Sequence, residues 1–185
     1  MCISPLTLWR NNATMDGKKT DIVPCGKCVE CLKRRANHWT FRLSQELKVA
    51  TSACFLTLTY EDVPLSNNGL PTLLKSDFQK FMKKLRKKSK SSLKYYACGE
   101  YGTRTQRPHY HLILFNLELD MIYPDKLRMV WQHGHVDVGD VQMSSIAYVT
   151  GYVVKGKFSP LDACQNTGLV DDRTPEFSLM SKGSA

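Results

Sequence analysis

The stretch Arg107-Pro-His-Tyr-His-Leu-Ile-Leu-Phe115 decides how this sequence folds. Its apolar, aromatic and β-branched residues predict a strand. Because the side chains of a strand alternate between two faces, His109 and His111 share one face and lie roughly 6–7 Å apart. Leu112 and Leu114 point to the other face. The strand therefore has one apolar face for a core and one face that carries two imidazoles.

The residues before this strand predict its partner. Lys94–Tyr101 also has strand character, and the loop 102–107 joins the two strands as a hairpin. With a turn centred near residues 104 and 105, Glu100 lies across from His109, at a Cβ distance of about 4.5–5.5 Å. We therefore expect Glu100, His109 and His111 to converge on one face.

Such a convergence predicts a metal site. Two buried imidazoles side by side each need a polar partner, and a shared metal satisfies both. Two imidazoles and one carboxylate leave coordination positions open, which suits Mn²⁺ or Mg²⁺ acting as a Lewis acid. Zn²⁺ would also bind these ligands, so the identity of the metal stays open. The alternative is a pair of ordinary surface or core histidines.

The pattern outward from this hairpin predicts the fold class. After a first helix, the order is strand, helix, strand, strand, helix, strand, helix, which indicates an α+β fold of the ferredoxin-like, split βαβ type. Its antiparallel sheet is expected to carry its helices on one face. The expected flanking elements are a helix at 32–50, a strand at 54–60, a helix from Ser76, a helix at 120–133, a strand at 135–141 and a helix from Ser144 or Ser145 to about 156.

The last predicted helix carries two tyrosines. Tyr148 and Tyr152 are four residues apart, so they share one face, and Lys155 continues that face. Two core tyrosines are the ordinary interpretation of this spacing. Ile146 and Val149 can supply the core face instead, which leaves the tyrosines free as nucleophiles. A phenol has a pKa near 10, so a nucleophilic tyrosine needs help from a lysine or a metal-bound phosphate.

The charge of the chain favours a polyanionic partner. The net charge is +9, from 26 basic and 17 acidic residues, and neutralised phosphates release counterions. The second helix has a basic run that is either a solvated face or a phosphate contact. The DNA-binding candidates are Lys83, Lys84, Arg86, Lys87 and Lys88, together with Arg107 before the histidine strand.

A cluster of cysteines lies near the N-terminus. Cys25-Gly-Lys-Cys28-Val-Glu-Cys31 has the spacing of metal ligands, and Cys2 can supply a fourth thiolate for a structural Zn²⁺ site. Free thiols and an iron–sulfur cluster are the alternatives, although the Cys-Pro element of ferredoxins is missing. The remaining cysteines are interpreted as buried or incidental thiols: Cys54, Cys98 and Cys164.

The composition excludes several classes of protein. At 42% hydrophobic residues the chain can form a packed core. No apolar run reaches the roughly 20 residues that cross a bilayer. Residues 1–10 lack the pattern of a secretory signal. We therefore expect no membrane contact and a reducing compartment, in which the seven cysteines do not form disulfides.

Together these motifs resemble a known superfamily. His-Tyr-His in a strand, followed by Tyr148-Val-Thr-Gly-Tyr152-Val-Val-Lys155, resembles the HUH endonucleases, and the strand CFLTLTY at 54–60 resembles their first motif. Met1-Cys2, Pro24–Cys31 and Gly99–Gly102 resemble the replication initiators of microviruses, in particular those of the gokushovirus branch. The order and spacing of these motifs are more specific than any one of them.

The resemblance implies a function in rolling-circle replication. It implies a metal on Glu100, His109 and His111 that polarises a phosphate of a single-stranded DNA origin. Tyr148 and Tyr152 would attack in turn through 5′-phosphotyrosine links, and Lys155 would steady the phosphate or the phenolate. The implied setting is the cytoplasm of a bacterial host, with the host replication helicase and polymerase as partners.

The resemblance also suggests a division of the chain. Residues 1–50 would form a cysteine-rich knuckle with a basic helix, 51–158 the endonuclease core, and 159–185 a C-terminal tail. Related initiators usually continue beyond this tail, so a truncated form is one interpretation. No Gly-x-x-x-x-Gly-Lys-Ser/Thr loop of a helicase motor occurs in the sequence.

Two rival functions remain open. The first is a non-catalytic module that binds single-stranded nucleic acid by stacking bases on Tyr95, Tyr96, Tyr101 and Tyr110. It has no need of a carboxylate, two histidines and a tyrosine pair together. The second is a transposase or plasmid relaxase with the same chemistry, and the paired tyrosines argue against a single-tyrosine transposase.

Overall fold

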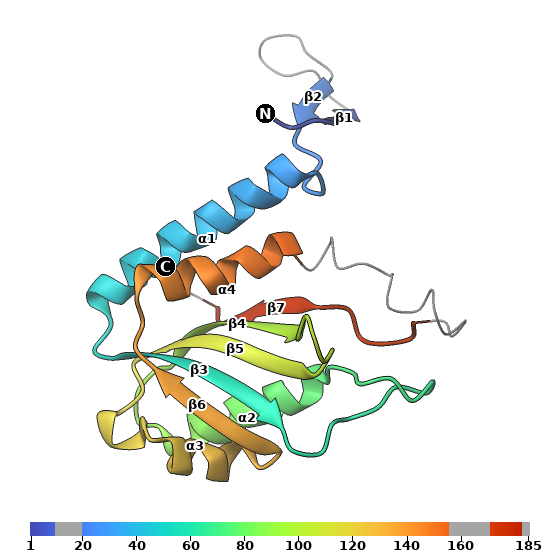
Figure 1. The fold of residues 1–185 in the computed structure, drawn as a ribbon. Helices are drawn as coiled ribbons and strands as arrows, with labels where there is room; N and C mark the ends of the chain where they lie inside the picture. Colours follow the sequence, from blue (N-terminus) through green and yellow to red (C-terminus); the bar gives the residue numbers. More distant parts are fainter. Residues whose placement is uncertain (10–19, 156–170, 183–185) are drawn as a thin grey trace.

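The structure is a computed structural model that describes residues 1–9, 20–155 and 171–182. A five-stranded antiparallel sheet forms its centre, in the spatial order β6–β3–β5–β4–β7 (Figure 1). The strands of this sheet are β3 (Ala53–Tyr60), β4 (Lys94–Tyr101), β5 (Pro108–Phe115), β6 (Gly134–Gly139) and β7 (Phe177–Met180). The α+β class and the antiparallel sheet predicted from the sequence are confirmed.

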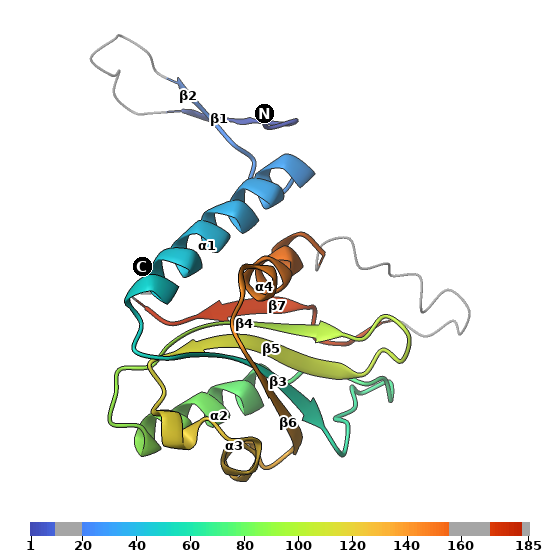
Figure 2. The ribbon, with the colours of Figure 1, turned by 60° about the vertical axis from the view of Figure 1, so that its left-hand side comes forward.

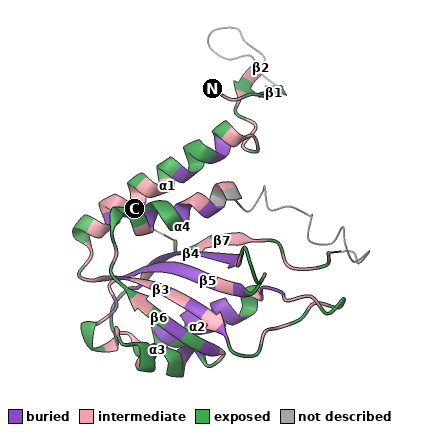
Figure 3. Ribbon diagram, viewed as in Figure 1, coloured by how far each residue is buried: buried purple, intermediate pink, exposed green. Residues whose placement is uncertain are grey.

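Strand β5, which contains the histidine stretch, lies at the middle of the sheet. It pairs with β3 on one side and with β4 on the other, both antiparallel. Every residue from Tyr110 to Phe115 is buried, in the middle of the purple region of the burial view (Figure 3). The predicted hairpin is therefore confirmed.

Helices cover both faces of the sheet (Figure 2). On one face, α2 (Lys75–Lys88) and α3 (Pro124–Trp131) cover the core that includes Leu112 and Leu114. On the other face lie α1 (Val29–Val49) and α4 (Met143–Lys155). The expectation of helices on one face was therefore incomplete.

The reason lies in the second half of β5. Ile113 and Phe115 share the face of the two histidines, and both are fully buried. Apolar side chains of this size require a cover, which α1 and α4 provide through Leu43, Ile146 and Val149. The two helices are further joined by a hydrogen bond between the hydroxyls of Thr40 and Thr150 at 2.8 Å. This packing brings α4 over the sheet beside the histidines.

Some element boundaries differ from the sequence-based ones. The third predicted helix divides into a 3₁₀ turn (Leu119–Met121) and α3, because Pro124 takes the first helical position of α3. Ser76 does not cap α2, which begins at Lys75 without a side-chain cap. Strand β7 lies in the tail in which the sequence showed no strong pattern, and it adds to the edge of the sheet beside β4.

The N-terminal part extends away from the sheet (Figure 1). The strands β1 (Leu6–Trp9) and β2 (Thr20–Val23) form a small antiparallel ribbon that precedes α1. The four predicted cysteine ligands gather at the start of this long helix. Among the described helices, none combines the length and the apolar character that crossing a bilayer requires.

Candidate active site

The two histidines and Glu100 are brought together by the pairing of β4 with β5. Glu100 is the register partner of His109, as the hairpin predicted, and Cys98 is the partner of His111. Nε2 of His109 lies 2.6 Å and Nε2 of His111 lies 3.0 Å from the same Oε1 atom of Glu100. The candidate ligand atoms of the three residues all lie within 4.8 Å of one another. They form a compact set of two nitrogens and one carboxylate.

The second nitrogen of each ring has its own partner. Nδ1 of His109 lies 3.0 Å from the carbonyl oxygen of Arg107, which can only accept. Nδ1 of His111 lies 3.0 Å from the hydroxyl of Thr57 on β3. These contacts favour the tautomer in which Nδ1 carries the proton and Nε2 has a lone pair directed at Glu100. Both imidazoles are therefore oriented as metal ligands.

Hydrogen bonding within this set also shifts its titration. Burial acts to raise the pKa of the Glu100 carboxyl, but the hydrogen bonds from His109 and His111 outweigh it and hold the pKa below its usual value. Burial acts to lower the pKa of His109, and the contact with Glu100 reverses this and raises it. Glu100 is thus an anion at neutral pH, as a metal ligand must be.

Helix α4 places the two tyrosines against this set. The ring centroid of His111 lies 5.3 Å from that of Tyr148 and 6.1 Å from that of Tyr152, and the two tyrosine rings are 5.0 Å apart. Phe55 of β3 stacks on His111 at 5.6 Å and contacts Tyr148 edge-on. One sheet face and one helix face therefore meet at His111.

The two tyrosines differ in their environment. Tyr148 is 46% exposed and Tyr152 is 8% exposed. Burial raises the pKa of both hydroxyls, and the negative charge of Glu100 raises both further. A hydrogen bond from Tyr152 acts in the opposite direction on Tyr148. Neither phenol ionises readily on its own, so attack by either one needs a nearby base or cation.

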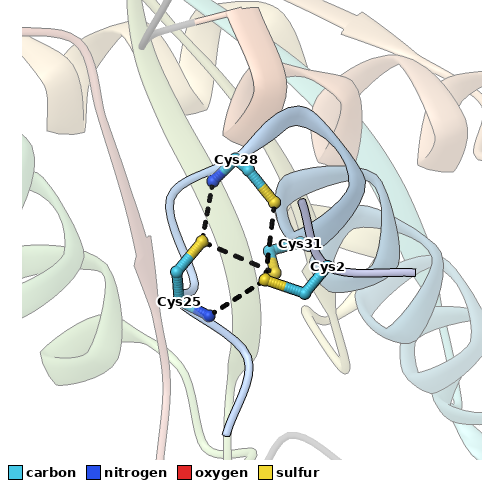
Figure 4. A group of neighbouring side chains, drawn as sticks. All are labelled: Cys2, Cys25, Cys28 and Cys31. Carbon is cyan, nitrogen blue, oxygen red and sulfur yellow. Dashed lines mark hydrogen bonds between the residues drawn. The ribbon is translucent and has the colours of Figure 1, made fainter. Parts of the chain in front are cut away.

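The four N-terminal cysteines form a second compact set (Figure 4). The Sγ atoms of Cys2 and Cys28 are 3.9 Å apart, and those of Cys25 and Cys31 are 4.0 Å apart. Four thiolates around a tetrahedral Zn²⁺, with Zn–S bonds of about 2.3 Å, lie about 3.8 Å from one another. The spacing of the four sulfurs therefore fits a closed tetrahedral site.

The backbone around Cys25 supports this arrangement. The amides of Lys27 and Cys28 both donate to Sγ of Cys25, at 3.4 and 3.3 Å, and Gly26 allows this turn with a φ of +71°. Backbone hydrogen bonds also lower the pKa of Cys28 to about 6, so this thiol ionises readily. Cys54 and Cys98 are buried free thiols, as predicted, and Cys164 lies outside the described residues.

Comparison with known proteins identifies the family. Residues 53–157 match the model of a family of replication-associated proteins that is described by its member ORF2. This match includes both halves of the candidate site and more than half of the chain. The chain belongs to this family. No solved structure matches the chain.

Three curated members come from phages. The chain is 35% identical over 155 residues to replication-associated protein ORF2 of Spiroplasma virus 4, and 32% identical over 153 residues to replication-associated protein VP4 of Bdellovibrio phage phiMH2K. These alignments cover 73% and 71% of this chain and 48% of each relative. Replication-associated protein ORF4 of Chlamydia phage 1 is 30% identical over 181 residues, which cover 85% of this chain and 44% of that protein.

These relatives confirm the resemblance to the replication proteins of gokushovirus-like microviruses. The chain spans about half the length of the curated relatives that it matches. A role in phage replication follows from the family, whereas the reaction itself has to be argued from the site.

The structure separates the predicted DNA-binding residues of this family member. Lys83, Lys84, Arg86, Lys87 and Lys88 lie on α2, which packs on the sheet face opposite to the histidines. Arg107 lies next to the site, where its guanidinium donates to the carbonyl oxygens of Tyr60 and Glu61. Lys155 is the last residue of α4, and its side chain lies outside what the structure describes.

Several residues on the site's face had not been assigned a role from the sequence. Besides Thr57 and Phe55, these are Thr59, His135 and Asp137, which lie in register across β3 and β6. Thr59 is the partner of both His109 and His135. Thr59, His135 and Asp137 border a hollow of about 480 Å³, together with Arg107 and Arg128. Their period-two spacing in the sequence was a usable signal, but only the strand order joins them to the histidines.

Proposed function

We propose that this chain is the nuclease part of a phage replication protein, which cuts and rejoins single-stranded origin DNA through a 5′-phosphotyrosine link and so starts rolling-circle replication. Its membership of a replication-associated family supports the biological role. One observation carries the chemical part: His111 is both 3.0 Å from Glu100 and in ring contact with Tyr148 and Tyr152. Candidate metal ligands and candidate nucleophiles therefore share one place.

The residues present fit a catalytic divalent metal. Two nitrogens and one carboxylate oxygen converge, and both histidines are oriented through Nδ1. This mixed set of three ligands suits Mn²⁺ or Mg²⁺ and leaves positions for phosphate oxygen and water. When bound, such a metal neutralises charge on the scissile phosphate and on Glu100, which also favours ionisation of the nearby phenols.

The chain's own residues would carry out the transfer. A tyrosine oxygen attacks phosphorus and loses its proton, the bond from phosphorus to the 3′ oxygen of the preceding nucleotide breaks, and that oxygen gains a proton. The products are a 5′-phosphotyrosine and a free 3′-hydroxyl that can act as a primer. Rejoining is the reverse attack by a 3′-hydroxyl. Lys155 follows Tyr152 along α4 and is proposed to steady the phosphate or the phenolate.

The exposure of the tyrosines suggests their order. Tyr148, at 46% exposed, can reach a phosphate that approaches from solvent, whereas Tyr152, at 8% exposed, lies behind it against His111. We assign the first attack to Tyr148. Tyr152 attacks in the next round, when Tyr148 is already linked to DNA.

The alternative of a non-catalytic binding module has weaker support. It requires base stacking on Tyr95, Tyr96, Tyr101 and Tyr110. The first two and Tyr110 are buried, and Tyr101 is covered by Arg173 at 4.7 Å. None of these rings offers an open stacking surface. The site is proposed to work in the cytoplasm of a bacterial host, with the host helicase and polymerase extending the primer.

A covalent-adduct assay tests this proposal. The protein is incubated with labelled single-stranded origin DNA and Mn²⁺ or Mg²⁺, and the protein–DNA adduct is resolved on a denaturing gel. We expect an adduct with the wild type and none with the Tyr148→Phe, Tyr152→Phe double variant. Tyr123→Phe, at an exposed tyrosine outside the site, is the matched control.

The single variants test the order of attack. Tyr152→Phe is expected to retain the first adduct and to lose transfer to a second strand, whereas Tyr148→Phe loses the first adduct. An adduct that survives in the double variant would overturn the assignment of the nucleophiles. DNA binding without an adduct, with an origin that the full-length relative cuts, would favour the binding module.

A further inference from the structure

Helix α2 presents a row of lysines to solvent. Its apolar side, with Phe78, Phe81 and Leu85, is buried in the sheet core. The exposed side carries lysines at helical spacing over three turns, which places them on one stripe. The stripe consists of Lys80, Lys83, Lys84, Lys87 and Lys88, and all five are exposed. We call these five residues the α2 stripe.

The α2 stripe lies across the sheet from the candidate active site. Residues of α2 pack with Leu112 and Leu114, whereas the tyrosines of α4 pack with Ile113 and Phe115 on the other side of β5. The two views agree that α2 and α4 lie on opposite faces (Figures 1 and 2). The nucleotides at the tyrosines therefore cannot contact the α2 stripe at the same time.

The charges of this stripe are largely uncompensated. Lys80 lies 3.4 Å from Asp77, and Lys84 donates to the side chain of Gln132. Across the described ranges, Lys83, Lys87 and Lys88 have no carboxylate within ion-pairing distance. Five neighbouring cations repel one another, and a polyanion relieves this repulsion.

The side chains around the stripe indicate the form of the polyanion. The aromatic residues of α2 are buried, and Tyr95 is 9% exposed with Arg86 over its ring at 5.4 Å. Proteins that hold single strands usually stack bases on exposed aromatic rings. The active-site face offers such a ring in Tyr148, but α2 does not. A stripe of lysines alone is suited to phosphates whose bases are already paired.

We propose that the α2 stripe binds the phosphates of double-stranded DNA. The dimensions agree, since Lys80 to Lys88 extends over about 12 Å of helix, a length in which a duplex carries about seven phosphate charges. Combined with the proposed nuclease function, on which this part rests, the chain holds duplex DNA on one face while it cuts a single strand on the other. The contact is independent of base sequence.

Duplex affinity as a function of salt concentration tests the inference. The variant replaces Lys83, Lys84, Lys87 and Lys88 by Gln in the full chain. The control replaces Lys27, Lys33, Lys48 and Lys182 by Gln, which removes the same charge from exposed positions away from α2. Binding to a duplex of arbitrary sequence and to a single strand of the same length is measured by fluorescence anisotropy, with circular dichroism to check folding.

We expect the stripe variant to lower the slope of log affinity against log salt for the duplex by about 3, because each lost phosphate contact removes about 0.9. The control is expected to change this slope by less than about 1. Single-strand affinity should fall no more in the stripe variant than in the control.

Two outcomes would overturn the inference. Equal slopes in the two variants would show that only net charge matters. A stripe variant that loses single-strand affinity as strongly as duplex affinity would show that α2 contacts the cut strand itself. Failure of the wild type to form a DNA adduct is a separate result, which removes the nuclease proposal and leaves the duplex measurement intact.

Discussion

The two candidate metal sites of this chain are built in different ways. Glu100, His109 and His111 come from two neighbouring strands at the centre of the sheet. The cysteine set, Cys2 with Cys25, Cys28 and Cys31, comes from the N-terminal segment and the start of α1, at the end of that helix away from the sheet (Figure 1). The first set depends on strand register, and the second on a local turn and one long-range contact.

Their ligands differ in the same sense. Four sulfurs at tetrahedral spacing complete a coordination shell and leave no position for a substrate. Two nitrogens and one oxygen leave positions open, and exposed Tyr148 lies beside them. The comparison teaches that donor number and surroundings, more than proximity of ligands, separate a site fitted for chemistry from one fitted for folding.

The largest expected effect comes from removing both imidazoles. His109→Ala with His111→Ala should lower the rate of DNA-adduct formation by at least about 10³-fold, because Lewis-acid stabilisation contributes several kcal/mol. His38→Ala, at an exposed position on α1, is the control. Adduct formation is followed by gel, and Mn²⁺ binding by calorimetry. Unchanged cleavage in the double variant would remove the metal from this site.

A smaller effect is expected at Thr57, whose hydroxyl contacts Nδ1 of His111. Thr57→Val should weaken Mn²⁺ binding by about 10–100-fold, as is usual for groups that orient a metal ligand. Thr57→Ser keeps the hydroxyl and should restore binding. Thr59→Val, on the same face opposite His109, is the matched control. If Thr57→Val binds as tightly as the control, the hydroxyl does not orient the imidazole.

The smallest effect on the sheet site is expected from the cysteine set. Cys28→Ser should release zinc and remove hydrogen-exchange protection from the described segments up to residue 31. Mn²⁺ affinity at Glu100 should stay within about 2-fold, since separated sites behave additively. Zinc content is measured by mass spectrometry alongside exchange. A large loss of Mn²⁺ binding would show that the two sites are coupled and would break the comparison.

Local sequence pattern determined much of the candidate site. Two-residue alternation put His109 and His111 on one strand face, and a short hairpin fixed Glu100 opposite His109. Four-residue spacing put Tyr148 and Tyr152 on one helix face. Each of these relations involves neighbours in the chain or across a single turn, where backbone geometry alone sets the direction of the side chains.

The tertiary structure decided the relations between distant segments. Only packing showed that α4 lies on the histidine face and α2 on the opposite one, so that the predicted basic helix is separated from the tyrosines. Only strand order joined Thr57 to His111 and added β7 to the sheet edge. These choices depend on which apolar surfaces bury each other best over the whole chain, and periodicity within one segment carries no record of its partner.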